Sequence, residues 1–245
     1  MQKIILSLFV VMLLLNITIA QGKSSVYDWP IKPGTPEWKA LQTHDEMLAV
    51  LQIPVAILNK MSTEELVETC LNYPLFLDIW AFNSYQDGID KAIAGFNGFQ
   101  ELIKRTLVGE ELLKRYQKIN MADIDNKKTE IEKWEFKMPV CKLEALLSQY
   151  VILKNMSKTN RLSLLRNLLD KNKVILKNGE YSFISYESNP YVAVRIMSID
   201  NSELLNKKLR EDKDFNEFFR KGTGITKKTI NDIVEISNLF LSNSK

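Results

Sequence analysis

The chain has 245 residues and a nearly balanced charge, with 33 Lys and Arg against 30 Asp and Glu, or +3 overall. This balance excludes the strongly basic surface that nucleic-acid-binding proteins present. One histidine and two cysteines are too few for a closed zinc site without carboxylate ligands. We therefore expect no nucleic-acid partner, no metal and no cofactor.

Residues 1–20 have the pattern of a secretory signal peptide. Lys3 gives a positive start, residues 4–15 are almost wholly apolar, and small or modest side chains follow up to Ala20. The apolar run is shorter than the roughly 20 residues that span a bilayer as a helix. We expect cleavage before Gln21 and a mature protein, net charge +2, that is secreted or periplasmic. An uncleaved membrane anchor is the alternative.

Residues 21–37 form an extended lead-in rich in Pro and Trp, because proline is excluded from helix interiors and central strands. We expect its tryptophans to pack across the first helices, and an exposed segment that docks a partner is the alternative. Residues 38–245 then form a helical domain, with two possible halves at about 38–120 and 129–245. No later stretch reaches 18 uninterrupted apolar residues, so we expect no membrane span after cleavage.

Helix signals dominate the rest of the chain. Capping boxes begin at Thr43 and Ser62, each with a glutamate three residues on. Gly95 and Gly98 indicate one helix end followed by a new start. Apolar stripes at helical spacing then recur: Val108, Leu112, Leu113, Tyr116 and Ile119; Leu143, Leu146, Leu147, Tyr150 and Val151; Leu162, Leu165, Leu168 and Leu169; Ile230, Ile233, Val234 and Phe240.

Residues 174–184 favour a different structure. Apolar and β-branched flanks surround Asn178-Gly179, a pair typical of tight hairpins, so a small β-hairpin is expected here as a decoration on the helical body. Residues 191–199 fit either a strand or a helix begun by Pro190, and we favour the helix.

A short sequence repeats within the chain. Residues 57–62 (ILNKMS) match residues 152–157 (ILKNMS), and each match is expected to end one helix and cap the next. Two copies of a helix–turn–helix unit would fit a helical-repeat array. Ordinary helix junctions would give the same match, so both interpretations stay open.

Three residues are the only candidates for nucleophilic chemistry. Cys70 and Cys141 could each be activated by His44, but neither cysteine lies in the electropositive, Gly-rich setting of a reactive thiol. An exported protein permits a disulfide between the two cysteines, and the helical spacing of Cys70 equally fits a buried free thiol. His44 follows a helix cap, where a surface histidine needs no function. We assign no catalytic, cofactor-binding or metal residue.

One further set of motifs lies between residues 27 and 116: Thr43-His44-Asp45-Glu46-Met47-Leu48, Gln52-Ile53-Pro54, Met61-Ser62-Thr63-Glu64-Glu65-Leu66, Leu71-Asn72-Tyr73-Pro74-Leu75, Ala81-Phe82-Asn83 and Phe96-Asn97-Gly98-Phe99-Gln100-Glu101-Leu102. These motifs resemble a group of secreted proteins of Bacteroides-type bacteria. The resemblance implies a helical exported protein of a Gram-negative cell. It implies no activity and no site residues.

We therefore expect an all-α fold, either a multi-helix bundle or a HEAT-like helical-repeat array. The expected function is that of an exported, non-enzymatic module that binds a protein or cell-envelope partner. The alternative is a secreted hydrolase or thiol enzyme with a Cys–His site. We assign no oligomeric state.

Overall fold

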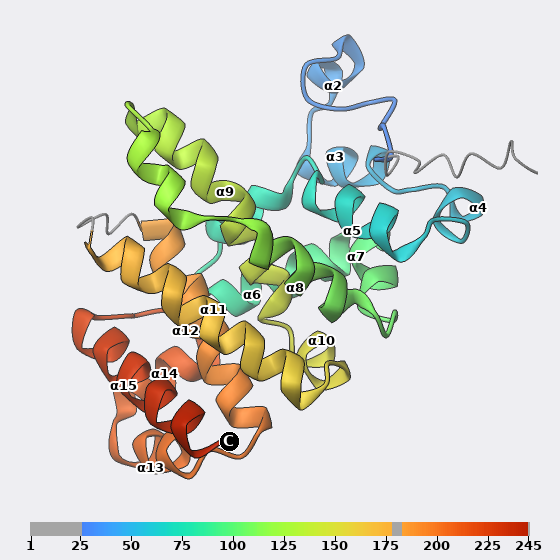
Figure 1. Ribbon diagram of the computed structural model, residues 1–245. Helices are drawn as coiled ribbons and strands as arrows, with labels where there is room; N and C mark the ends of the chain where they lie inside the picture. Colours follow the sequence, from blue (N-terminus) through green and yellow to red (C-terminus); the bar gives the residue numbers. More distant parts are fainter. Residues whose placement is uncertain (1–25, 178–182, 245) are drawn as a thin grey trace, which may run out of the picture.

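The computed structural model describes residues 26–177 and 183–244, and every regular element within them is a helix (Figure 1). The fold is therefore all-α. The expected signal peptide, residues 1–20, lies outside the described residues. The helices are α2 (Pro36–Ala40), α3 (His44–Val50), α4 (Val55–Leu58), α5 (Thr63–Leu71), η1 (Phe76–Ala81), α6 (Tyr85–Gly95), α7 (Asn97–Leu102), α8 (Val108–Lys118), η2 (Met121–Asn126), α9 (Glu130–Leu147), α10 (Tyr150–Asn155), α11 (Lys158–Lys177), α12 (Phe183–Ile199), α13 (Glu203–Glu211), α14 (Lys213–Lys221) and α15 (Lys227–Asn243).

Helix α12 is the centre of the C-terminal part. It contacts α9, α10, α11, α13, α14 and α15, and residues 188–197 are buried all round. A helix that is buried on every face must be covered by neighbouring elements on every face. The element α6 also contacts α14, far away in the sequence. In a repeat array each unit touches only its neighbours, so these contacts are those of a bundle.

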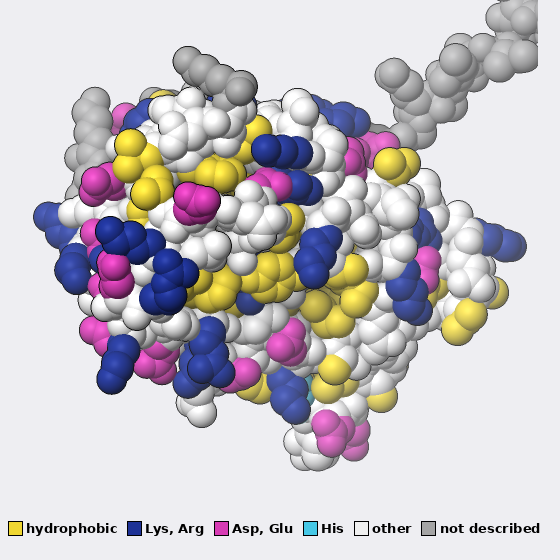
Figure 2. Space-filling view, turned by 90° about the horizontal axis from the view of Figure 1, so that it is seen from below, with side chains coloured by type: hydrophobic (Ala, Val, Ile, Leu, Met, Phe, Trp, Pro, Cys, Tyr) yellow, Lys and Arg dark blue, Asp and Glu magenta, His cyan; other side chains and the backbone are white. Residues whose placement is uncertain are grey.

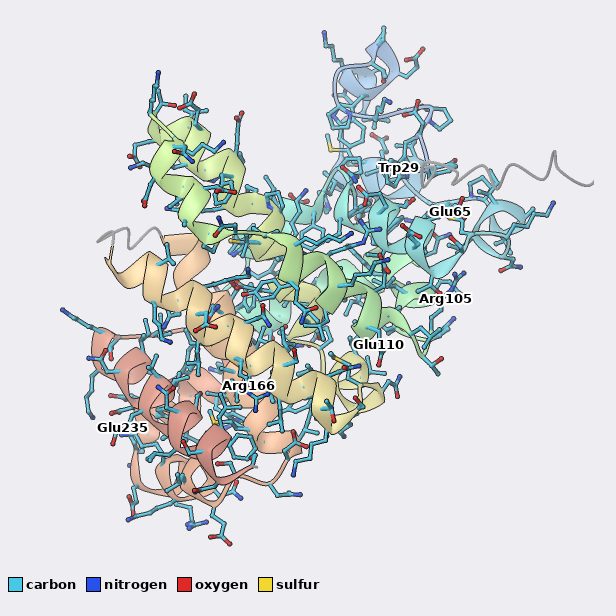
Figure 3. The ribbon with its side chains drawn as sticks, in the orientation of Figure 1. Trp29, Glu65, Arg105, Glu110, Arg166 and Glu235 are labelled. Atoms are coloured by element: carbon cyan, nitrogen blue, oxygen red, sulfur yellow. The ribbon has the colours of Figure 1, made fainter. Side chains whose placement is uncertain are left out.

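The N-terminal lead-in packs on the first helices, as the sequence predicts. Trp29 is buried, and its indole nitrogen donates a hydrogen bond to the carbonyl of Leu51 at 2.7 Å (Figure 3). Its ring also contacts Tyr27, Tyr73 and Phe96. One continuous set of buried side chains runs from Trp29 to Ile233, so Trp29 of the N-terminal lead-in belongs to the main core.

Local signals fix most helix starts. The capping boxes at Thr43 and Ser62 are confirmed, and Thr129 forms a third with Glu132. The expected break at Gly95 is also confirmed, because α6 ends there and α7 begins two residues later. Each cap satisfies amide groups that the first turn of a helix leaves without partners.

The prediction of a β-hairpin near residues 174–184 is wrong, because the segments on both sides of the expected turn are helical. Residues 174–177 form the last turn of α11, and α12 begins at Phe183. The turn predicted at Asn178-Gly179 lies outside the described residues. The physical reason is that α11 continues the stripe of buried leucines from Leu162 to Leu169, and helix packing overrides a local strand preference. Residues 191–199 are helical as expected, but Pro190 lies inside that helix.

The repeated hexapeptides form similar junctions. Both run from a short helix into a serine-capped longer helix, and in both an arginine binds the carbonyls of the matching Leu and Met. Arg105 donates to Met61 at 2.6 Å and Leu58 at 3.4 Å. Arg161 donates to Met156 at 2.5 Å and Leu153 at 3.3 Å. The two arginines come from unmatched sequence positions, so the likeness is confined to the junction.

Within the described ranges, no helix combines the length and the apolarity needed to cross a bilayer.

Candidate functional site

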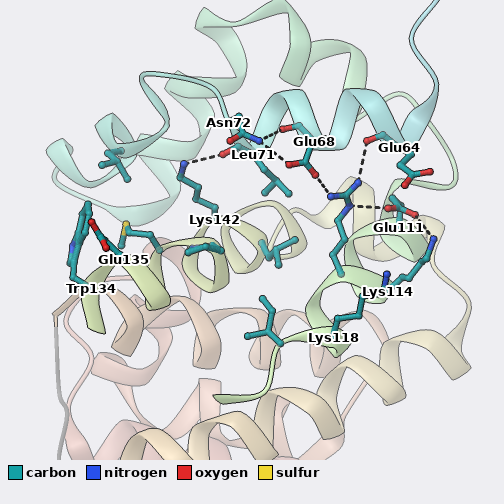
Figure 4. Close-up of a pocket in the computed structure, with 16 residues that line it drawn as sticks. Glu64, Glu68, Leu71, Asn72, Glu111, Lys114, Lys118, Trp134, Glu135 and Lys142 are labelled. Atoms are coloured by element: carbon teal, nitrogen blue, oxygen red, sulfur yellow. Dashed lines mark hydrogen bonds and ion pairs between the residues drawn. The ribbon is translucent and has the colours of Figure 1, made fainter. Parts of the chain in front are cut away.

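A groove runs between α5, α8 and α9, with a volume of about 620 Å³ (Figure 4). This volume falls within the range of about 300–1,000 Å³ typical of ligand pockets. The groove lies where the N-terminal helices meet α9. We define it by the residues that line it: Glu64, Glu68, Leu71, Asn72, Leu77, Glu111, Lys114, Arg115, Lys118, Ile119, Trp134, Glu135, Met138, Pro139, Lys142 and Leu143.

Apolar side chains line the middle of the groove, and Trp134 lies at one end. Leu71, Met138 and Leu143 are among the apolar residues, and the Trp134 side chain is 44% exposed. An exposed aromatic side chain that adjoins an apolar groove floor is a common feature of binding sites.

Pro139 interrupts the backbone hydrogen-bond pattern of the same wall. It lies inside α9 and lines the groove. Because proline has no amide hydrogen, the carbonyl of Glu135 lacks the donor that a helix normally supplies four residues later.

Ion pairs fix the opposite end of the groove. Arg115 donates from Nε to Glu111 at 2.8 Å, pairs through Nη1 with Glu68, and reaches the carbonyl of Glu64 at 3.3 Å (Figure 4). These contacts tie α8 to α5. The Arg115 side chain is 20% exposed, so the network is partly shielded from water and defines a rigid wall.

Lys142 closes the edge between α5 and α9. Its Nζ donates to the carbonyl of Leu71 at 2.9 Å and lies 5.4 Å from the centre of the Phe76 ring. Burial lowers the pKa of Lys142, because water is partly removed from the ammonium. This lysine satisfies a carbonyl at the C-terminus of α5, where a positive charge is favourable.

The groove has no dominant charge. Four glutamates and four Lys or Arg residues line it, and Arg115 is paired with two of the glutamates. Acidic and basic side chains are also interspersed on the face shown in Figure 2, with apolar patches between them. Such a surface is not an electrostatic footprint for nucleic acid.

The three residues singled out from the sequence do not come together as a catalytic group. Nε2 of His44 lies 2.8 Å from Oδ2 of Asp78, so its observed partner is a carboxylate. Cys70 and Cys141 are both free and fully buried. Burial raises the pKa of each thiol, which disfavours the thiolate that a nucleophile requires.

A buried polar cluster lies behind the groove floor. Glu144 follows Leu143 on α9 and is 1% exposed. Its carboxylate accepts hydrogen bonds from Tyr116 at 2.7 Å, from Asn189 at 3.1 Å and from the Ser188 hydroxyl. Burial raises the pKa of Glu144. These hydrogen bonds join α8, α9 and α12 as a structural clamp.

Sequence reasoning missed the groove residues. Ile131, Trp134 and Met138 follow one another at helical spacing near the start of α9, where Phe136 is the only other apolar residue among residues 130–138. That spacing is visible in the sequence. The ion pairs that build the opposite wall are not visible there, because Arg115 and Glu68 are 47 residues apart.

No three side chains of the metal-ligating types gather at one point in the described part of the chain. Comparisons of the chain with models of known protein families, with curated proteins and with solved structures found no match.

Proposed function

We propose that the mature protein is an exported, non-enzymatic binding module, and that the groove between α5, α8 and α9 holds a peptide segment of a protein partner. The observation that supports this most strongly is the uncovered Trp134 beside an apolar floor. Aromatic side chains of this kind are the commonest energetic anchors of protein interfaces.

The chemistry of the groove indicates what the segment contains. The apolar floor favours one or two large apolar side chains, and the balanced rim favours flanking residues of both charges. Lys118 and Glu64 bring one charge of each sign to the rim.

Export rests on the sequence. The positively charged start, the apolar run of residues 4–15 and the small residues before Gln21 support a signal peptide and a secreted or periplasmic location. The burial of both cysteines supports a binding protein over the thiol-enzyme alternative.

Selection from a random peptide display library on the purified mature protein tests this function. We expect enriched peptides to share a large apolar residue flanked by charged residues, and to be displaced by one another at a single site. A library that enriches no peptide family above the level on an unrelated helical protein would contradict the proposal.

A further inference from the structure

A second hollow lies away from the groove, between α13 and α14, and has a volume of about 420 Å³ (Figure 1). The two helices pack against each other, and Nδ2 of Asn216 on α14 donates a hydrogen bond to the carbonyl of Leu209 on α13 at 2.9 Å. We call this hollow the basic pocket and define it by its lining residues: Leu209, Arg210, Lys213, Asn216, Glu217, Arg220 and Lys221.

The lining of the basic pocket carries an excess of positive charge. Four of its residues are Lys or Arg, and Glu217 is the only carboxylate among them. That carboxylate already pairs with Lys221 at 3.3 Å. The groove differs in this respect, because equal numbers of acidic and basic side chains line it. The two sites therefore favour ligands of different chemistry.

Three cations of the basic pocket lack a counter-ion. The side chains of Arg210, Lys213 and Arg220 are exposed, and none of them forms an ion pair within the described residues. On the same pair of helices Lys208, which does not line the pocket, pairs with Asp212 at 3.1 Å. Like charges around one hollow repel one another, and an anion bound among them replaces this repulsion by attraction.

Helix electrostatics accounts for only part of this charge. Arg210 lies in the last turn of α13 and Arg220 in the last turn of α14, where cations are favourable. Lys213 is the first residue of α14, where the helix dipole disfavours a positive charge. The cap residue Asp212 is already paired with two other lysines, and Asp214 does not line the pocket. A bound anion would offset the unfavourable placement of Lys213.

We propose that the basic pocket binds a phosphate monoester, either as a small soluble molecule or as the headgroup of a lipid. This group carries close to two negative charges at neutral pH and three acceptor oxygens, which matches the three unpaired cations. The planar guanidinium groups of Arg210 and Arg220 can each bind two phosphate oxygens at once. A carboxylate brings a single charge and two oxygens, so it leaves part of the site unpaired.

The pocket is large enough for a phosphate with a small polar scaffold, because its volume lies within the range of about 300–1,000 Å³ typical of ligand sites. The site goes beyond the proposed peptide groove, since the two share no lining residue. The outcome of a peptide selection on the groove therefore leaves this proposal unchanged.

Ligand-observed NMR and calorimetry on the mature protein test the site with three soluble probes. Glycerol phosphate carries the group, glycerol lacks it, and succinate places two negative charges on separate carboxylates. Vesicles of phosphatidylcholine with and without phosphatidate, a lipid whose headgroup is a phosphate monoester, test the lipid source by co-sedimentation.

The variants each remove one positive charge. Lys213→Gln and Arg220→Gln act on the pocket. Lys207→Gln is the matched control, because Lys207 is exposed on α13 and does not line the pocket. All three replaced side chains are exposed, so the core is not disturbed, and circular dichroism and the unfolding midpoint establish that each variant is folded.

We expect glycerol phosphate to bind the wild type, succinate to bind at least about threefold more weakly, and glycerol not to bind. Lys213→Gln and Arg220→Gln should each weaken glycerol phosphate about three- to tenfold, and Lys207→Gln less than about twofold. Vesicle binding that requires phosphatidate and is reduced in both pocket variants identifies the lipid source, and glycerol phosphate binding without it identifies the soluble source. The proposal is overturned if neither glycerol phosphate nor phosphatidate vesicles bind, if succinate binds more tightly than glycerol phosphate, or if Lys207→Gln weakens binding as much as Lys213→Gln.

Discussion

The hydroxyl of Tyr116 donates to Oε1 of Glu144 at 2.7 Å, and both side chains are fully buried. Ser188 and Asn189 donate to the same carboxylate from α12. One glutamate thus joins three helices. Replacing Glu144 by Ala leaves the buried hydroxyls of Tyr116 and Ser188 without an acceptor, at about 1–3 kcal/mol each, whereas Asn189 keeps the carbonyl of Leu168.

We therefore expect Glu144→Ala to lower the free energy of unfolding by at least about 2 kcal/mol. Urea unfolding measures this change. Glu130→Ala is the matched control on the same helix; its carboxylate is exposed, so a loss below about 0.5 kcal/mol is expected. If the two variants lost the same free energy of unfolding, Glu144 would not act as a structural clamp between the helices.

The raised pKa of Glu144 also predicts a pH dependence. A folded pKa above the unfolded value, about 4.3, means that the folded state holds the proton more tightly. Its stabilisation is complete below that pH and is lost as the pH rises through the folded pKa. Relative to Glu144→Gln, which cannot titrate, the wild type should lose stability as the pH rises above about 4.3 and through the folded pKa. If the wild type instead became more stable relative to Glu144→Gln as the pH rises, the result would contradict this prediction.

The pKa of Asp212 is shifted in the opposite direction to that of Glu144, so its effect on stability depends on pH in the opposite sense. Its carboxylate caps α14 through the amide of Phe215 at 3.0 Å and pairs with Lys208 and Lys228, and these contacts lower its pKa. Its stabilisation is present above the unfolded pKa of about 3.9 and is lost as the pH falls below it.

Asp212→Ala should cost about 1–2 kcal/mol at pH 7, the usual value of an N-cap, and less at pH 3. Asp214→Ala, in the same first turn but exposed, is the control and should cost less than about 0.5 kcal/mol. Thermal unfolding at the two pH values checks both variants. A cost for Asp212→Ala that is the same at pH 3 and pH 7 would argue against the charge contribution.

The two cysteines should be unreactive in the folded protein. Both are free and fully buried. A thiol reagent should label neither Cys70 nor Cys141 under native conditions and both after unfolding in guanidinium without reductant. Labelling of neither after unfolding would reveal a disulfide, and rapid native labelling would reveal an accessible thiol.

Replacing the two arginines at the repeated junctions by alanine should lower the free energy of unfolding by different amounts. Arg161 binds Asp200 through two nitrogens, with side chains 11% and 5% exposed. Removing it leaves a buried carboxylate unpaired, which costs about 3–5 kcal/mol. Arg105 pairs with Glu101, whose side chain is 27% exposed, so Arg105→Ala should cost less than Arg161→Ala in urea unfolding. The reverse order would contradict this account.

The parts of the fold that depend on residues close together in the sequence were predictable from the sequence. The caps at Thr43 and Ser62 and the leucine stripe of α11 are local patterns, and all three were confirmed. The flanks of Asn178-Gly179 misled because a local hairpin preference competes with the burial of two long helices, which the sequence does not display.

The groove was harder to predict for the same reason. Lys142 and Leu71 meet across 71 residues, and only packing brings them together. The exposed apolar residues at the start of α9 were the one local signal. Ile131 and Trp134 lie one turn apart there, and only Trp134 lines the groove.

That pair gives the most direct measurement of the proposed function. A peptide selected on the mature protein is titrated into the wild type, Trp134→Ala and Ile131→Ala, and the dissociation constants are compared. Both residues are exposed, at 44% and 71%, so neither substitution disturbs the core. We predict that Trp134→Ala weakens binding by about tenfold or more and that Ile131→Ala changes it by less than about twofold. Equal affinities for the wild type and Trp134→Ala would contradict the assignment of the groove as the binding site.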